Sequence, residues 1–386
     1  MKKLFACICA LGLLSANAQD ENRAITTAVP FLLIPTDARS AGMGELGVAS
    51  SPDAYSQQWN PAKLAFAESQ IGIGVTYTPY LSDLVDDIFL GGISYYNRIN
   101  ERSAWSASFR YFSLGEIQFN EFDGFNIIPQ GTEEPNEFAL DVAYALKLSD
   151  RFSMSVSGRF INSNLRLNAV DPDASAASSF AVDIAGYYQS EEIAYNDFNG
   201  RWRGGFNISN LGPKLSYDQG GDEFYLPTLL RLGGGFDFLF PGGLNKLAVN
   251  AELGKLLVPS PVFMDDNGNG EIDSGEVRQP DDSFISGVFT SFGDADGGIS
   301  EELEEFTWAL GAEYTYDDAF ALRAGYFNES ENKGARRFFT LGAGFKYNVV
   351  KLDVSYLFSA SQVRNPLENT LRFSLTFNLG EEYIEY

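Results

Sequence analysis

One segment of the chain carries oxygen-bearing residues at the spacing that a calcium ion requires. Positions 1, 3, 5, 7, 9 and 12 of the twelve-residue segment 265–276 hold six candidate ligands: Asp265, Asn267, Asn269, Glu271, Asp273 and Glu276. Glu271 would offer its backbone carbonyl and Glu276 both carboxylate oxygens, and a glycine at position 6 permits the sharp turn. Prolines before the segment exclude the usual incoming helix. We therefore predict a structural Ca²⁺ site, with an ion-free acidic loop as the alternative.

Histidine chemistry is excluded, because none of the 386 residues is a histidine. A Ser-His-Asp or Cys-His relay and a histidine-bearing zinc site are therefore impossible, which leaves lysine, carboxylate or tyrosine chemistry, or none. The spacing Gly42-x-Gly44-x-x-Gly47 matches a dinucleotide fingerprint, but no βαβ pattern surrounds it. The net charge of −25 would repel nucleic acid. We predict no catalytic residue, no nucleotide cofactor and no nucleic-acid partner, and we interpret the acidic run 301–305 as solvated charge.

The N-terminal segment has the features of an export signal. A positive start and the short apolar run 4–14 precede the small residues of Ala16-Asn17-Ala18, which predicts a signal peptide over 1–18, cleaved after Ala18. Both cysteines of the chain, Cys7 and Cys9, lie within it. A lipoprotein box ending at Cys7 would leave no room for the apolar run. The mature protein is expected to be exported and free of cysteine.

Most of the remaining chain alternates between apolar and polar side chains, with the period of two that a β-strand requires. Over 371–379, leucine and phenylalanine occupy the odd positions, whereas arginine, serine, threonine and asparagine occupy the even ones. A soluble β-sandwich also alternates, but its strands average about five or six residues, whereas these segments are near the length of a membrane-spanning strand. Aromatic residues near the segment ends also favour a membrane barrel.

Fourteen such segments are expected, near 70–79, 87–97, 103–113, 136–148, 151–164, 179–190, 200–210, 227–239, 246–257, 304–316, 319–329, 336–347, 350–359 and 369–380. An even strand number and alternating short and long connections are typical of bacterial outer-membrane barrels. The predicted fold is therefore all-β: a 14-stranded antiparallel transmembrane β-barrel over 69–386, with 258–303 as a long extracellular loop. The expected location is the lipid bilayer of the bacterial outer membrane.

Residues 19–68 precede the first strand and lack its alternation. They contain an apolar run, 29–35, followed by a glycine-rich stretch, and they are too apolar to remain a solvated tail. Side chains of the wall alone would not fill a barrel of this width. We expect this segment to enter from the periplasm and to lie in the lumen as a plug.

Two stretches of the expected plug resemble the N-terminal motifs of the PorV/PorQ family. They are Thr36-Asp37-Ala38-Arg39-Ser40-Ala41-Gly42-Met43-Gly44 and Trp59-Asn60-Pro61-Ala62-Lys63-Leu64. The motif residues carried over are Asp37, Arg39, Gly42, Gly44, Asn60 and Pro61. Further similarity extends to the last strand, at 365–373. Family members are similar to the FadL fatty-acid channels, which are fourteen-stranded barrels with an N-terminal plug.

The resemblance implies a role in type IX protein secretion. Its partners would be the type IX translocon barrel, the C-terminal signal domains of secreted cargo, and the sortase and attachment complex that receives the cargo. No particular residue can be assigned to cargo binding. A FadL-like channel for hydrophobic small molecules is the alternative function, and a lipopolysaccharide deacylase is disfavoured because the chain has no histidine.

Overall fold

The structure is a computed structural model, and it describes residues 23–81, 85–122, 126–165, 176–217, 221–263, 277–278, 280–361 and 365–383. The predicted signal peptide, 1–18, and all six predicted calcium ligands, within 265–276, lie outside these residues.

Fourteen antiparallel strands form one closed sheet, in which each pairs with its neighbour in the chain and the ring closes between the first and last strands. They are β1 Ser69–Pro79, β2 Ile88–Asn100, β3 Ser103–Leu114, β6 Asn136–Ser149, β7 Phe152–Asn164, β8 Ala177–Gln189, β10 Asn199–Leu211, β13 Leu229–Leu239, β14 Asn245–Leu256, β17 Phe306–Tyr316, β18 Phe320–Asn328, β19 Arg337–Tyr347, β20 Val350–Ser359 and β21 Leu371–Glu382. Every predicted strand is confirmed, with each end within three residues of the observed one.

The predicted direction of the side chains is also confirmed. On β21, Leu371 and Phe373 are 47% and 41% exposed, whereas Arg372 and Thr376 are only 2% and 4% exposed. The apolar register therefore faces outward and the polar register faces the lumen, as a barrel in lipid requires.

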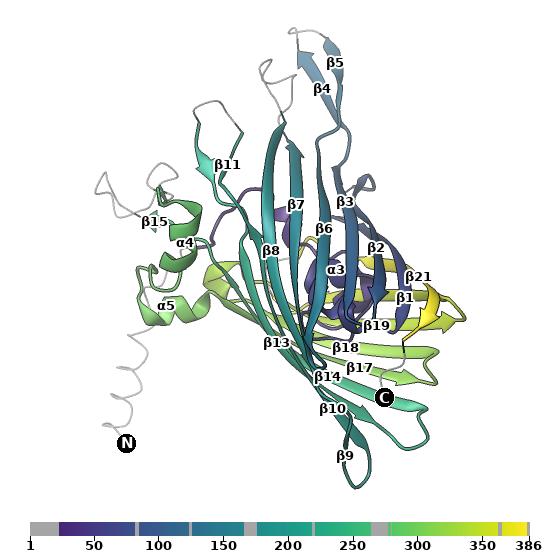
Figure 1. Cartoon of the computed structure of the whole chain (residues 1–386). Coiled ribbons are helices and arrows are strands. Elements are labelled where there is room, and N and C mark those ends of the chain that lie inside the picture. The colour runs from purple at the N-terminus through teal and green to yellow at the C-terminus, as the bar shows by residue number, and fades with distance from the viewer. Residues whose placement is uncertain are drawn as a thin grey trace, which may run out of the picture.

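The connections differ at the two ends of the barrel (Figure 1). We call the end with the connections 101–102, 150–151, 190–198, 240–244, 317–319 and 348–349 the short-turn end, and the opposite end the long-loop end. At the tight turn between β17 and β18, Asp317 and Asp318 both adopt a left-handed backbone, with φ of 53° and 50°. This pair of conformations is that of a type I′ turn, in which aspartate is tolerated, and the N–H of Ala319 closes it by donating to the carbonyl of Tyr316.

The long connections contain elements that the sequence analysis treated as plain loops. A hairpin, β4 Ile117–Phe122 and β5 Ile127–Glu133, projects beyond β3 and β6 (Figure 1). The other elements are the short strands β11 Leu215–Ser216, β12 Glu223–Phe224, β15 Val262–Phe263 and β16 Val277–Arg278, and the helices α4 Phe284–Thr290, α5 Ile299–Glu304 and η4 Glu331–Lys333. At the short-turn end, the connection 190–198 contains the short strand β9 Ile193–Ala194. Among the described residues, no helix has the length and apolar character needed to cross a membrane.

The N-terminal segment lies inside the barrel as a plug (Figure 1). It contains the short helices η1 Pro30–Leu33, α2 Ala38–Ala41, α3 Ser56–Trp59 and η2 Pro61–Phe66. Apolar residues fasten it at two levels. Phe31 and Leu32 pack with Leu90 and Phe112 towards the long-loop end, and Phe66 packs with Tyr187 towards the short-turn end. The apolar core of the protein is therefore the contact between plug and wall.

The direction of the plug corrects the expectation that it enters from the periplasm. Its first described residue, Arg23, donates its backbone N–H to the carbonyl of Asn332, at the long-loop end. The segment finishes at the short-turn end, where the carbonyl of Glu68 accepts a hydrogen bond from the N–H of Tyr383 at 2.7 Å. The described part of the plug thus runs from the long-loop end through the lumen to the start of β1.

Candidate functional site

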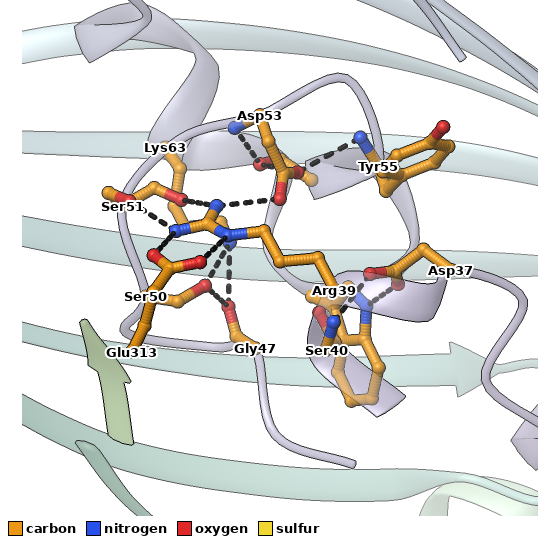
Figure 2. Close-up of polar contacts among 12 residues, drawn as sticks. Asp37, Arg39, Ser40, Gly47, Ser50, Ser51, Asp53, Tyr55, Lys63 and Glu313 are labelled. Atoms are coloured by element: carbon orange, nitrogen blue, oxygen red, sulfur yellow. Dashed lines mark hydrogen bonds and ion pairs between the residues drawn. The ribbon is translucent and has the colours of Figure 1, made fainter. Parts of the chain in front are cut away.

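The plug is joined to the barrel wall by a buried network centred on Arg39 (Figure 2). Its guanidinium donates to both carboxylate oxygens of Glu313 on β17, at 3.0 and 2.7 Å. The third nitrogen donates to the carboxylate of Asp53 at 2.8 Å and to the carbonyl of Ser51 at 3.0 Å. A two-point contact of this kind fixes the orientation as well as the distance of the two groups. Arg39 therefore ties two parts of the plug to one strand of the wall.

The network continues along the wall through neighbouring strands. Arg323 on β18 donates to Glu313 at 2.6 Å and pairs with Asp353 on β20 at 2.8 Å. Lys351 lies 3.5 Å from the same Asp353. With Arg39 and Asp53, the network holds three cations and three carboxylates, so its charges cancel. Such compensation is what allows charges to be buried.

Asp37 organises the plug itself. It is the N-cap of α2, where its carboxylate accepts the N–H of Ser40 at 2.7 Å. The other carboxylate oxygen accepts the indole N–H of Trp59, at the end of α3, also at 2.7 Å. A capping aspartate of this kind satisfies a backbone donor that a short helix leaves free. Asp37 thereby holds the two helices together.

The paired glycines let the plug approach the wall closely. A Cβ on Gly42 would lie 3.0 Å from the Cα of Gly342 on β19. Gly44 has a left-handed backbone, φ +80°, and a Cβ there would lie 2.8 Å from the carbonyl oxygen of Tyr326 on β18. Glycine is required at such a conformation and approach. The spacing that matches a dinucleotide fingerprint therefore serves backbone packing here.

Asn60 and Pro61 begin η2 and fix the plug at the short-turn side. The side-chain carbonyl of Asn60 accepts the N–H of Ala62, and its amide donates to the carbonyls of Val48 and Gly186 at 2.9 and 3.0 Å. Pro61 occupies the first turn of η2, where a missing N–H costs nothing. All six family-motif residues predicted from the sequence thus lie in the plug and hold its fold or its contact with the wall.

A small cavity, with room for about one water molecule, lies between the plug and the strands β1 to β3. Its lining includes Gln57, Ser94 and Arg110, all from the plug or the lumen-facing register. The Gln57 amide nitrogen, the Ser94 hydroxyl and two Arg110 nitrogens have no hydrogen-bond partner among the described residues. These polar groups make the cavity suited to water or polar atoms and unsuited to an apolar molecule.

A second network, the mouth cluster, lies at the long-loop end and consists of Lys255, Glu301, Glu302, Glu305 and Lys333. Lys255 pairs with Glu302 and Glu305 at 2.7 and 2.6 Å. Lys333 pairs with Glu301 and Glu305 at 2.8 and 3.0 Å. Glu301 also accepts a hydrogen bond from Arg23, at the beginning of the plug, at 3.0 Å. The cluster therefore fastens α5, η4 and the plug to the mouth of the barrel.

The mouth cluster corrects the interpretation of 301–305 as solvated charge, because Glu305 is buried. Burial acts to raise the pKa of Glu305, but hydrogen bonds from Lys255, Ser260 and Lys333 outweigh it and hold the pKa below its usual value. Burial likewise acts to lower the pKa of Lys333, but hydrogen bonds to the glutamates raise it. These opposing shifts are those of an ion pair that both partners stabilise.

Three carboxylates near this cluster lie close enough to share a metal ion. The carboxylate oxygens of Asp294, Glu302 and Glu305 are all within 4.8 Å of one another. The ammonium group of Lys255 already pairs with two of the three. Because a protein cation already lies against two of these carboxylates, their closeness is explained without a metal.

The wall residues of both networks were not predicted as site residues. Glu313 and Arg323 interrupt otherwise small or polar positions on the lumen-facing register, whereas Lys255, at the end of β14, shares the register of the outward-facing Leu253. A charged side chain inside a closed barrel needs an oppositely charged partner, so charged residues at lumen-facing positions predict a buried ion-pair network. The identity of each partner depends on how the plug sits against the wall, which the strand pattern does not encode.

The family model described as "Type IX secretion system protein PorV" matches residues 17–263. No curated protein matches the chain.

Several solved structures are distantly similar. They include a Pseudomonas aeruginosa FadL homologue (12% identity, TM-score 0.44, covering 90% of this chain and 99% of that chain), the Ralstonia pickettii toluene transporter TbuX (13%, 0.46, 90% and 97%) and the P. putida toluene transporter TodX (12%, 0.46, 90% and 99%). At these identities and scores, they say nothing of what this chain binds.

The family match covers more than half of the chain and includes the whole plug with its motif residues. The chain therefore belongs to the family of type IX secretion system protein PorV, as an outer-membrane β-barrel component of that system.

Proposed function

We propose that the protein binds the C-terminal signal domain of secreted cargo at the type IX translocon and delivers it to the sortase and attachment complex. The observation that carries this proposal is the family match over residues 17–263. The role is one of binding and transfer, and no catalytic step is assigned to the chain.

The geometry supports work at the outer surface rather than through the lumen. The plug is buried against the wall, and the networks of Arg39 and the mouth cluster hold it at two levels. The long-loop end presents the projecting β4–β5 hairpin and the helices α4 and α5 (Figure 1). Both edges of the β4–β5 hairpin are unpaired among the described residues. An open edge of this kind can accept a strand from another protein.

The test is a secretion assay in cells that lack the protein. Cargo carrying a C-terminal signal domain should accumulate in the periplasm and reach the surface again when the chain is restored. A variant with the hairpin 117–133 replaced by a short Gly-Ser turn should fail to restore secretion. The matched control replaces the short-turn connection 191–198, at the opposite end, and should restore it. Normal secretion without the protein would refute the proposed function.

The alternative, a channel for hydrophobic small molecules, finds little support in the lumen. The small cavity beside the plug is lined by the polar side chains of Gln57, Ser94 and Arg110. An apolar solute would leave these groups without hydrogen bonds, at a cost of about 1–3 kcal/mol each. Impaired uptake of an apolar nutrient, together with normal secretion, would favour the channel instead.

The calcium site remains a proposal, because its ligands lie outside the described residues. The flanking residues favour a compact loop, since β15 pairs with β16 through Val262 and Arg278. This short ladder brings the two ends of the segment together, as an ion-wrapping loop requires.

Calcium should slow proteolysis within 258–303, with a midpoint of about 0.1–1 mM, the range of extracellular sites of this type. Glu276→Gln should abolish the protection, because it removes the bidentate ligand. Asp281→Asn, outside the ligand spacing, should leave it intact. Equal cleavage with calcium and with a chelator would remove the site from consideration.

A further inference from the structure

Two short helices at the long-loop end expose apolar side chains on one face each. On α4, Ile285 and Phe289 are four residues apart, so they share a face, and they are 57% and 75% exposed. On α5, Ile299 and Leu303 have the same spacing and are 82% and 65% exposed. No charged residue occupies these four positions. Figure 1 shows α4 and α5 next to each other, where β17 begins.

The opposite faces of both helices are held against the protein. A Cβ on Gly287 of α4 would lie 3.0 Å from Pro259 and 3.0 Å from Tyr225, so this face is in close contact with two neighbouring loops. On α5, Glu301 and Glu302 pair with Lys333 and Lys255 of the mouth cluster. The apolar face of α5 cannot turn inward without breaking these ion pairs. The inner face of α5 is therefore polar and that of α4 is closely packed, whereas the outer face of each helix is apolar.

This arrangement is the one found in the barrel wall, and the two surfaces are contiguous along the chain. Strand β17 begins at Phe306, two residues after α5 ends at Glu304. Its outward side chains Trp308 and Leu310 are exposed. Leu253 of β14, which lies directly opposite Trp308, is also exposed. Tryptophan at the end of a strand is typical of the boundary between lipid and water. The helices thus follow directly beyond the lipid-facing belt.

We propose that α4 and α5 lie in the membrane interface, with Ile285, Phe289, Ile299 and Leu303 in contact with the acyl chains of the outer leaflet. An amphipathic helix in this position buries its apolar face at the boundary between headgroups and acyl chains. A lipid surface fits better than a protein partner because the apolar faces extend a surface that is already in lipid. The inference depends on the barrel being in a membrane and is independent of cargo binding.

The test places nitroxide spin labels at single cysteines, since the sequence after Cys9 contains no other cysteine. Phe289→Cys and Ile299→Cys are compared with Leu310→Cys, which faces lipid on β17, and with Asp281→Cys, whose side chain is fully exposed. The protein is reconstituted in phosphatidylcholine vesicles, and collision with oxygen and with a water-soluble nickel chelate is measured. A difference in mobility on SDS gels between heated and unheated samples confirms that each variant is folded as a barrel.

Labels at 289 and 299 should show an oxygen-to-nickel ratio close to that at 310 and several-fold above that at 281. A ratio equal to that at 281 would overturn the proposal. Labels that the nickel chelate reaches in vesicles but not in native membranes would point to a protein partner, and that result would also overturn the assignment to lipid.

Discussion

Replacing Arg39 by alanine should release the plug without unfolding the barrel. Arg39 is the only described residue that connects Asp53 of the plug with Glu313 of the wall through its own ion pairs. Its side chain and those of its two partners are 6%, 14% and 9% exposed, so water cannot replace the lost contacts. The strands remain paired through their backbones, which the substitution does not touch.

The size of the effect follows from what remains after the change. Removing one partner of a buried ion pair costs about 3–5 kcal/mol, because the other charge is left uncompensated. Glu313 keeps Arg323 at 2.6 Å, so the lower limit applies. A cost of about 3 kcal/mol corresponds to a roughly 100-fold larger population with the plug released. Arg39→Lys keeps the charge and loses one of the two hydrogen bonds to Glu313, which should give a roughly tenfold larger population with the plug released.

Limited proteolysis measures this population, because cleavage follows the open fraction when reclosing is faster than cleavage. The loss of residues 23–68 from the folded protein is followed in detergent, while migration on unheated SDS gels reports the barrel. The control is Lys246→Ala, which removes an exposed ion pair with Asp318 at the short-turn end. Exposed pairs contribute only about 0–1 kcal/mol, so cleavage should change little.

Equal cleavage of the Arg39→Ala, Lys246→Ala and unaltered proteins would refute the reasoning, since the network would then contribute nothing to plug retention. Loss of the folded barrel together with the plug would also contradict it, because the wall would depend on the plug for its own pairing.

Three further perturbations test other contacts. Gly44→Ala should destabilise the protein by about 2–5 kcal/mol in thermal unfolding, because the alanine would be strained by the left-handed backbone and would also overpack against β18. Gly242→Ala, where φ is +87° but the surrounding space is open, should cost only about 1–2 kcal/mol. Denaturant unfolding of the protein from vesicles measures the cost of a charge on the lipid-facing belt. Leu375→Arg, at the middle of the belt, should lower the free energy of unfolding by about 2–4 kcal/mol, and Leu379→Arg, near the strand end, by about 0–1 kcal/mol. Because the folded-state pKa of Glu305 is lowered, its stabilising contribution is complete above the unfolded value of about 4.3 and is lost as the pH falls through the lower folded-state pKa. A spin label on α5 should therefore become mobile on acidification, and unchanged mobility over an acid titration continued until the barrel itself unfolds would contradict this.

The barrel could be predicted from the sequence because a lipid-exposed wall imposes the same rule on every strand. Alternate residues such as Leu371 and Phe373 must be apolar, and the intervening Arg372 must be sheltered, so each strand reports its own orientation. The fourteen long strands were therefore located with each end within three residues of the observed one. The plug was predicted for a simpler reason, namely that its composition is too apolar for a solvated tail and that a wide lumen must be filled.

The details inside the lumen could not be predicted, because they depend on contacts between residues far apart in the chain. From its pattern, Thr376 is a small lumen-facing residue of the kind that usually tolerates change. In the structure its hydroxyl donates to Tyr55 of the plug at 3.1 Å, so a larger side chain would collide with the plug. The direction of the plug was wrong for the same reason. Composition predicts that the segment fills the lumen, but its direction is determined by contacts such as that of Arg23 with Glu301 at the long-loop end.

The charged character of the contact between plug and wall follows from the membrane outside. Because the outer face of each strand must be apolar, the alternating pattern gives the inner face most of the polar residues. A wholly apolar plug would leave those polar groups without partners, at a cost for each one. Paired charges such as Arg39 and Glu313 satisfy them and also admit few alternative positions, since a displaced plug would break the buried ion pair between them. The family motif is thus the part of the chain that sets the position of the plug, which explains why it lies in the lumen and leaves the outer surface available for partners.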